Sequence, residues 1–415
     1  MAAAHVADSP SAARERVLVN VLFSLIGIGY LFPFSALTQP VDYWSHLFPD
    51  FNIEFLITCT FMYTNLVMLG LLVSFGDSPW ITGRVVGGFA GQLIVLVFVP
   101  ASYHFLTTES ANMMAVLGAT AFAAVVTAFL DSCVISLASH YPMYAQESLQ
   151  FGIGLSTLIG SIYRDLTKVI FPSDAIVLSS GVYFYTGAVT VALCIVAYFT
   201  LLSLPISKRC LAPASTTREH SPLLVEAQPN DSTAVQTSLK VDAPAPNRWD
   251  VLRKCLGNQI QVALVFTCSL ALWPPLVTEM KSYNFPSLQA SGWWPLLLLT
   301  LFSVCDCLGR FLISYRCGLT KDNIWRMVAV RFVMIPAIVA SVKGLCFTHD
   351  AFSILFVLYL GFTNGYIGSL AIIFVNDCVE PHEKAVAGSF TGFFLNFGLV
   401  LGSTVGLVLS HVLGL

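Results

Sequence analysis

Charged residues are scarce in this chain. Only 10% of its 415 residues are Asp, Glu, Lys or Arg, against about 25% in an ordinary soluble domain. Hydrophobic residues make up 56%, and the mean hydropathy is +0.77. So little charge cannot cover the surface of a water-soluble protein of this length. Most side chains must therefore face lipid or other helices.

A basic surface and metal-binding motifs are also missing. The net charge is −3 and no clustered basic stripe occurs, so the sequence lacks the positive field that nucleic-acid binding needs. None of the 11 cysteines stands in a Cys-x-x-Cys or Cys/His metal spacing, and most lie in apolar runs as small hydrophobes. We therefore expect no nucleic-acid partner, no metal and no cofactor. No nucleotide-binding loop or catalytic set is visible either, so we do not expect an enzyme.

Long apolar runs dominate the rest of the sequence. A helix crosses roughly 30 Å of hydrocarbon with about 20 residues. Eleven runs approach that length, at 17–37, 55–75, 85–103, 115–138, 149–163, 176–204, 260–276, 294–315, 327–342, 352–375 and 386–413. The sequence predicts an all-α polytopic membrane protein with eleven transmembrane helices, whose surroundings are the lipid bilayer.

One polar segment, residues 205–253, interrupts these runs. It is rich in Ser, Thr, Pro, Ala and Gln, which cannot bury enough apolar surface to fold alone. We therefore predict a cytosolic tail at 1–16, a six-helix bundle at 17–204, a disordered cytosolic linker at 205–253 and a five-helix bundle at 254–415. The tail does not resemble a cleavable signal peptide.

The distribution of Lys and Arg predicts the orientation, because cytosolic loops carry the excess of positive residues. With a cytosolic N-terminus, most of the 20 Lys and Arg residues fall on the cytosolic side. The exceptions outside the spans are Arg164, Lys168, Lys281 and Lys343. The odd number of spans then places the C-terminus outside the cytosol. We expect the protein in the plasma membrane.

Asp306 and Arg310 form the sharpest chemical feature. An ionisable residue at the centre of a span costs about 2.5 to 3.5 kcal/mol on insertion scales. These two lie four apart on one helical face, where carboxylate and guanidinium can pair. One interpretation is an ion pair that only joins helices. Because such pairs stabilise weakly, we favour a site for a polar ligand, and a donor beside an acceptor suits a diol such as ribose.

Other polar residues within the spans allow several interpretations. Asp131 must face a cavity or another helix; it could accept from a nucleobase N–H, relay a proton or bond a hydroxyl. We expect Arg331 to reach the membrane interface from its position near a span end, and Arg164 to be a solvated edge residue. Asn364 could serve a ligand or helix–helix hydrogen bonding. Glycines four apart, at 83, 87 and 91, at 388 and 392, and at 398, 402 and 406, predict close helix packing.

Several motifs resemble one known family. FSVCDCLGRF (302–311) is similar to the eighth-helix signature of equilibrative nucleoside transporters, with its D-x-x-G-R spacing. FTNGYIGSLAIIF (362–374) and ALWPPLVTEMKSY (271–283) resemble the tenth-helix and seventh-helix tracts of that family. GIGYLFPF, VRFVMIP and EKAVAGSFTGFFLNFGLVLG resemble its first, ninth and eleventh helices. The matches follow the family order through both halves of the chain.

The resemblance implies a fold, an activity and site residues. The implied fold is major-facilitator-like, with six plus five helices in two bundles that rock around a central cavity. The implied activity is facilitative transport of nucleosides, a small-molecule substrate. Asp306 and Arg310 match the ribose-contacting pair, and Asp131 stands at the position that reads the base. The further implied contacts are Phe34, Ser303, Met62, Asn65 and Leu399.

Three departures from the family pattern affect the expected substrate. Asp131 replaces a common Gln, Phe34 replaces Trp and Ser303 replaces Asn. A carboxylate at the base position favours a ligand rich in N–H donors, so we expect purine nucleosides such as adenosine, with nucleobases as further substrates. Two alternatives stay open: a proton-coupled transporter of nucleosides or organic cations that uses Asp131, and a membrane signalling or scaffold protein that transports nothing.

Overall fold

The computed structural model describes residues 10–49, 53–75, 80–172, 174–211 and 247–414. These residues form helices and connecting segments, without a strand among them. The helices of the first half are α1 (Pro10–Thr38), α2 (Val41–Leu47), α3 (Ile53–Phe75), α4 (Ile81–Phe105), α5 (Glu109–Asp131), α6 (Val134–Ser139), α7 (Met143–Ile170), α8 (Ile176–Ser203) and α9 (Pro205–Leu211). Those of the second half are α10 (Arg248–Leu272), α11 (Pro275–Thr278), α12 (Pro286–Ala290), α13 (Trp293–Phe311), α14 (Ile324–Arg331), α15 (Met334–Val342), α16 (Asp350–Val375) and α17 (Lys384–Leu413), with short 3-10 turns at Leu312–Ser314 and Asn376–Cys378.

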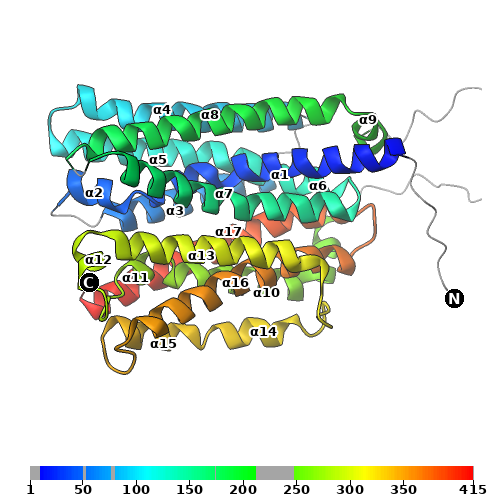
Figure 1. Ribbon diagram of the computed structural model, residues 1–415. Helices are drawn as coiled ribbons and strands as arrows, with labels where there is room; N and C mark the ends of the chain where they lie inside the picture. Colours follow the sequence, from blue (N-terminus) through cyan, green and yellow to red (C-terminus); the bar gives the residue numbers. More distant parts are fainter. Residues whose placement is uncertain (1–9, 50–52, 76–79, 173, 212–246, 415) are drawn as a thin grey trace, which may run out of the picture.

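The long helices run side by side in two groups. In Figure 1, α1 to α9 occupy the upper part and α10 to α17 the lower part. We call these the N-terminal group and the C-terminal group. They meet where α7 packs against α13 and where α17 packs against α3 and α6. The all-helical, polytopic prediction is confirmed.

Ten helices or helix pairs in the described ranges are long and apolar enough to cross a membrane. They correspond to ten of the predicted spans. The predicted span at 149–163 lies within α7, a 28-residue helix that is long enough but less apolar. Its buried face carries Gln150, Ser156, Thr157, Ser161 and Arg164, because it faces other helices and not lipid. The count of eleven spans stays a prediction.

Both ends of the predicted linker are helical, since α9 covers Pro205–Leu211 and α10 begins at Arg248. The disorder predicted for its middle, 212–246, lies outside the described residues, as does most of the predicted tail at 1–16. The predicted bundle boundaries stay predictions. The start of α1 and the end of α17 lie at opposite ends of the helix array (Figure 1).

Arg164 corrects one expectation from the sequence. It is not a solvated edge residue: its side chain is 1% exposed, and its guanidinium lies 2.7 Å from the Asp42 carboxylate. It also donates to the hydroxyls of Ser179 and Ser180. The short helix α2 folds back over α8 and brings Asp42 to the arginine. A buried guanidinium needs such partners to offset its lost hydration.

Glycines set the closest helix approaches. A Cβ at Gly398 would lie 2.2 Å from the Ala263 carbonyl oxygen, so α17 touches the backbone of α10 there. Gly402 also packs closely, since a Cβ there would lie 2.6 Å from the Thr267 carbonyl oxygen. The stripe on α4 behaves differently: Gly91 contacts Val126, whereas a Cβ at Gly87 would meet nothing within 4 Å. The predicted packing role therefore fits most of the α17 glycines, with Gly388 in ordinary contact only, and fits α4 in part.

This difference yields a stability prediction. Gly398→Ala should destabilise the protein by about 1–3 kcal/mol, because the added carbon overpacks a backbone contact. Gly87→Ala is the matched control; it should leave stability unchanged or raise it slightly, since Ala is the better helix former by about 1 kcal/mol. Melting temperatures in detergent micelles measure both. Equal melting temperatures for the two variants would contradict the packing described for α17.

Candidate functional site

A cavity of about 100 Å³ lies between the two groups of helices. The polar residues on its wall come from both groups, with Asp131 and Asn65 from α5 and α3 and Asp306 and Arg310 from α13. Seven of the eight residues predicted for the site line it: Phe34, Met62, Asn65, Asp131, Asp306, Arg310 and Leu399.

Ser303 is the predicted residue that the cavity does not include. It lies on α13, is fully buried, and its hydroxyl sits 3.1 Å from that of Ser161 on α7. It also donates to the carbonyl oxygen of Leu299 one turn earlier. Ser303 thus links α13 to α7 outside the lining of the cavity. Its expected contact with the substrate stays a prediction.

The Asp306–Arg310 pair forms as predicted from the spacing. Arg310 Nε donates to Asp306 Oδ2 at 2.9 Å, and both side chains are nearly buried. Arg310 Nη1 also donates to Gln150 Oε1 of α7 at 2.9 Å, so the guanidinium bridges the two groups. Gly154 makes room for it: a Cβ there would lie 2.6 Å from Arg310 Cδ. This places a fixed cation and a fixed anion in one wall of the cavity.

Asn364 holds the other oxygen of the Asp306 carboxylate. Its Nδ2 donates to Asp306 Oδ1 at 2.6 Å, and its Oδ1 accepts from the Ser269 hydroxyl at 2.6 Å. Ser269 in turn accepts from Arg331 Nη2 at 2.5 Å. The chain Arg331, Ser269, Asn364, Asp306 is therefore a continuous relay of hydrogen bonds across α14, α10, α16 and α13.

Arg331 corrects a second expectation. Its side chain is fully buried and does not reach the membrane interface. Besides Ser269, it donates to the Thr363 hydroxyl, and its Nε has no hydrogen-bond partner among the described residues. α14 ends at Arg331 and α15 begins at Met334, so a helix break leaves the arginine directed into the bundle. The relay connects its guanidinium to the Asp306 carboxylate through Ser269 and Asn364.

Asp131 lies at a break between α5 and α6. A carboxylate at a helix C-terminus opposes the helix dipole, so it needs donors from elsewhere. Asn65 Nδ2 and Asn396 Nδ2 both donate to Asp131 Oδ2, at 2.8 and 2.9 Å. Asn65 Nδ2 also donates to Asn396 Oδ1 at 2.7 Å. This cluster joins α3 and α5 to α17, and thus the two groups.

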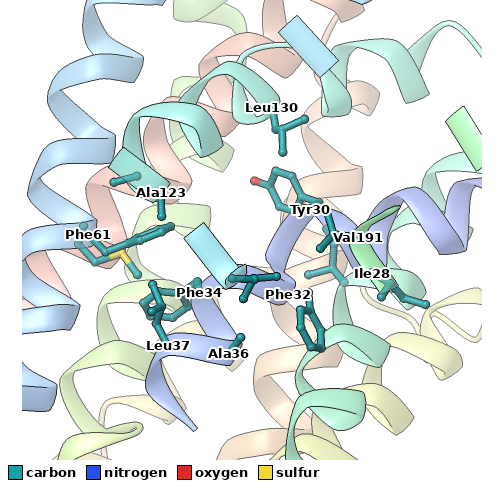
Figure 2. Close-up of a cluster of buried hydrophobic side chains, with 14 of the residues drawn as sticks. Ile28, Tyr30, Phe32, Phe34, Ala36, Leu37, Phe61, Ala123, Leu130 and Val191 are labelled. Atoms are coloured by element: carbon teal, nitrogen blue, oxygen red, sulfur yellow. The ribbon is translucent and has the colours of Figure 1, made fainter. Parts of the chain in front are cut away.

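Aromatic pairs complete the walls. Phe34 and Phe61 lie with ring centroids 4.9 Å apart, and Figure 2 shows them side by side. On the C-terminal group, the rings of Trp273 and Phe302 stack at 4.7 Å with an angle of 15° between their planes. Flat apolar surfaces with a few converging polar groups suit a planar polar ligand.

Contacts at both ends of α7 hold the two groups together. At its C-terminal end, Lys168 donates to the Gly292 carbonyl oxygen at 3.1 Å, and Asp165 accepts from Thr300 at 2.8 Å. At its N-terminal end, Gln146 accepts from Asn376 at 3.0 Å. The cavity between these contacts is smaller than the roughly 300 Å³ of typical ligand pockets, so the walls must separate to admit a ligand.

Several residues that line the cavity were not predicted, among them Tyr30, Gln150, Trp273 and Asn396. Gln150 and Asn396 carried a usable signal, since each is an amide within an apolar run, where polar side chains need a partner. Tyr30 and Trp273 carried none, because aromatic residues are ordinary in membrane helices. Among the described residues, no group of three His, Cys, Asp or Glu could hold a metal ion.

The fold is that of a transporter of the major facilitator type. The structure of the xylose transporter XylE from E. coli aligns over 96% of this chain and 97% of its own, with a TM-score of 0.56 and 10% sequence identity. A peptide transporter of the POT family aligns over 96% of this chain and 91% of its own, with a TM-score of 0.57 and 13% identity. The major-facilitator-like architecture is confirmed.

The sequence comparisons define the family. The pattern of the nucleoside transporter family matches residues 117–411, so the chain belongs to this family. Equilibrative nucleotide transporter 8 of Arabidopsis thaliana is 24% identical, over 93% of both chains. Equilibrative nucleoside transporter 2 of Homo sapiens is 23% identical, over 95% of this chain and 97% of its own. The chain is a multi-pass membrane transporter and not an enzyme.

The relay to Asp306 predicts a positioning effect of Arg331. Arg331→Met should fold but lower kcat/KM for nucleoside uptake about tenfold, the equivalent of one hydrogen bond, because Ser269 no longer orients Asn364. Arg326→Met, on the same helix but with an exposed side chain, is the matched control and should transport normally. Uptake at equal surface expression measures both, and an unchanged Arg331→Met variant would remove the relay from function.

Proposed function

We propose that this protein carries nucleosides across a membrane by facilitative alternating access, with a preference for purine nucleosides and with nucleobases as further substrates. The observation that supports this most is the Asp306–Arg310 pair inside the cavity. A polar pair in the membrane interior needs a purpose, because packed apolar residues would stabilise the fold at least as well.

The pair suits a ribose. Asp306 accepts and Arg310 donates, so the 2′- and 3′-hydroxyls of a sugar could engage both, each hydroxyl being donor and acceptor at once. The relay through Asn364 and Ser269 holds the carboxylate in place before the ligand arrives. A preorganised site loses less entropy on binding. The base would then lie between the aromatic rings, towards Asp131.

Alternating access requires that the contacts between the groups break at one end at a time. The hydrogen bonds at the two ends of α7 are the candidates: Lys168 to Gly292 at one end and Asn376 to Gln146 at the other. Neither pair lies on the cavity wall. Opening one end would break one of these end contacts and would also strain the bridges at the cavity, Arg310 to Gln150 and Asn396 to Asp131.

Radiolabelled adenosine uptake into a transport-null host tests the proposal. Asp306→Ala and Arg310→Ala should each lower saturable uptake about 10- to 100-fold, because each removes charge-assisted hydrogen bonds. Arg326→Ala, whose side chain is exposed, is the matched control at equal surface expression. Uptake indifferent to both site substitutions would remove the pair from the site, whereas absent uptake in the wild type would favour a protein that transports nothing.

Proton coupling is the second candidate, and one observation favours it. Asp131 is buried with amide partners, and no basic side chain of the described residues pairs with it. Facilitative transport should change little between pH 7.5 and 5.5. Uptake that rises at pH 5.5 and collapses with a protonophore would instead identify a proton-coupled transporter of nucleosides or organic cations.

The proposed orientation places the N-terminus in the cytosol, the C-terminus outside and the protein in the plasma membrane. Two exposed cysteines can test it, because Cys317 follows α13 and Cys346 follows α15. A membrane-impermeant maleimide should label Cys346 on intact cells and reach Cys317 only after permeabilisation. Cys346→Ser should abolish the surface label and Cys317→Ser should leave it unchanged. The opposite pattern would reverse the orientation.

A further inference from the structure

We propose that the cavity wall formed by Asn65 and Asp131 presents only hydrogen-bond acceptors, and that it selects nucleosides whose base carries an exocyclic amine. Adenosine, guanosine and cytidine should therefore be preferred over inosine and uridine. The inference rests on the proposed transport of nucleosides. It would replace the purine preference, because it groups bases by amine against carbonyl and not by ring size.

The amide hydrogens in this cluster are all engaged. Asn65 Nδ2 donates to Asp131 Oδ2 at 2.8 Å and to Asn396 Oδ1 at 2.7 Å. Asn396 Nδ2 donates to Asp131 Oδ2 and to the Gly392 carbonyl oxygen, both at 2.9 Å. Each amide nitrogen carries two hydrogens, so neither asparagine has a donor left for a ligand.

The carboxylate fixes the direction of both amides. If Asn65 turned over, its oxygen would face the Asp131 carboxylate at hydrogen-bond distance. If Asn396 turned over, its oxygen would face that carboxylate and the Gly392 carbonyl oxygen together. Oxygen atoms that only accept repel one another at such distances, so the hydrogen-bond network permits a single arrangement.

Acceptors remain free on this wall. Asn65 lines the cavity, and its Oδ1 is buried without any hydrogen-bond partner among the described residues. Asp131 receives the two amides on Oδ2 and a hydrogen bond from the Tyr30 hydroxyl, and a carboxylate has about four acceptor positions, so it can accept one more. Buried polar atoms are nearly always paired in folded proteins. A donor on the ligand would complete this part of the cavity.

The opposite wall differs, because it offers donors as well as an acceptor. Arg310 is a cation paired with the Asp306 carboxylate, and Trp273 Nε1 is a buried donor without a partner among the described residues. Both residues line the cavity from the C-terminal group. A ligand with hydroxyl groups at one end and an amine at the other therefore matches the cavity in one direction, with the amine towards Asn65 and Asp131.

An exocyclic amine suits two adjacent acceptors because one nitrogen offers two hydrogens. Adenine and cytosine each present such an amine, and guanine presents an amine beside a ring N–H. Hypoxanthine and uracil present a single ring N–H next to a carbonyl, so a carbonyl oxygen would face the carboxylate. A site built for donors rejects such analogues strongly, since its own groups are left unpaired.

The experiment is uptake of five nucleosides into liposomes that contain the purified protein, so that cellular metabolism does not interfere. Adenosine, guanosine and cytidine should each exceed inosine and uridine at least tenfold in kcat/KM. Faster uptake of adenosine, guanosine and inosine than of both pyrimidines would overturn the inference, since ring size would then select. Equal uptake of all five would also overturn it, together with the purine preference, while leaving the proposed transport of nucleosides intact.

No saturable uptake of any nucleoside would instead defeat the proposed function and the inference with it. The variant Asp131→Asn adds a donor to the wall, so the ratio of adenosine to inosine should fall at least threefold. Ser269→Ala is the control at the sugar end; it should lower all five rates by a similar factor and leave the ratio unchanged. Should Asp131→Asn fail to fold, the five wild-type rates still decide.

Discussion

The membrane interior forces every buried charge to find partners, and this constraint organises the centre of the protein. Removing an ion from water costs several kcal/mol even after relaxation. Asp306 meets the demand with Arg310 and Asn364, whereas Asp131 meets it with two amides and the Tyr30 hydroxyl, and with no cation from the described part of the chain. The two carboxylates thus differ in kind. Asp306 is half of an ion pair, whereas Asp131 accepts hydrogen bonds from neutral donors.

These polar clusters need helices that approach closely and end in mid-bundle. Gly154 admits the Arg310 side chain, and Gly365 lets α16 touch α13 at the Asp306 carbonyl oxygen. The breaks after Asp131, Leu272 and Arg331 each place a site or relay residue at a helix end, with Trp273 directly following α10. Interrupted helices at membrane depth are tolerated only where protein or a cavity surrounds the freed backbone groups. The positions where helices pack closely or end are therefore the positions that hold the polar residues of the cavity.

The sequence predicted the helical fold and seven of the residues that line the cavity, for identifiable reasons. Long apolar runs specify spans because lipid leaves no alternative, and the four-residue spacing of Asp306 and Arg310 specifies their shared face. Arg331 and Arg164 were misjudged because distance from a span end was taken to decide exposure. Their partners, Ser269 and Asp42, lie 62 and 122 residues away in the chain. Contacts between residues so far apart in the chain depend on tertiary packing, and the local sequence pattern around each arginine does not predict them.

The distribution of polar contacts between the two groups bears on how such a protein can move. Arg310 meets Gln150, and Asp131 meets Asn396, so both clusters at the cavity bridge the groups. A rocking motion that opened either end would strain these bridges unless a ligand replaced part of them. A ligand that bonds to Arg310 at one end and to Asn65 at the other would supply that replacement. Binding energy could then lower the cost of the transition, so recognition and movement would depend on the same few hydrogen bonds.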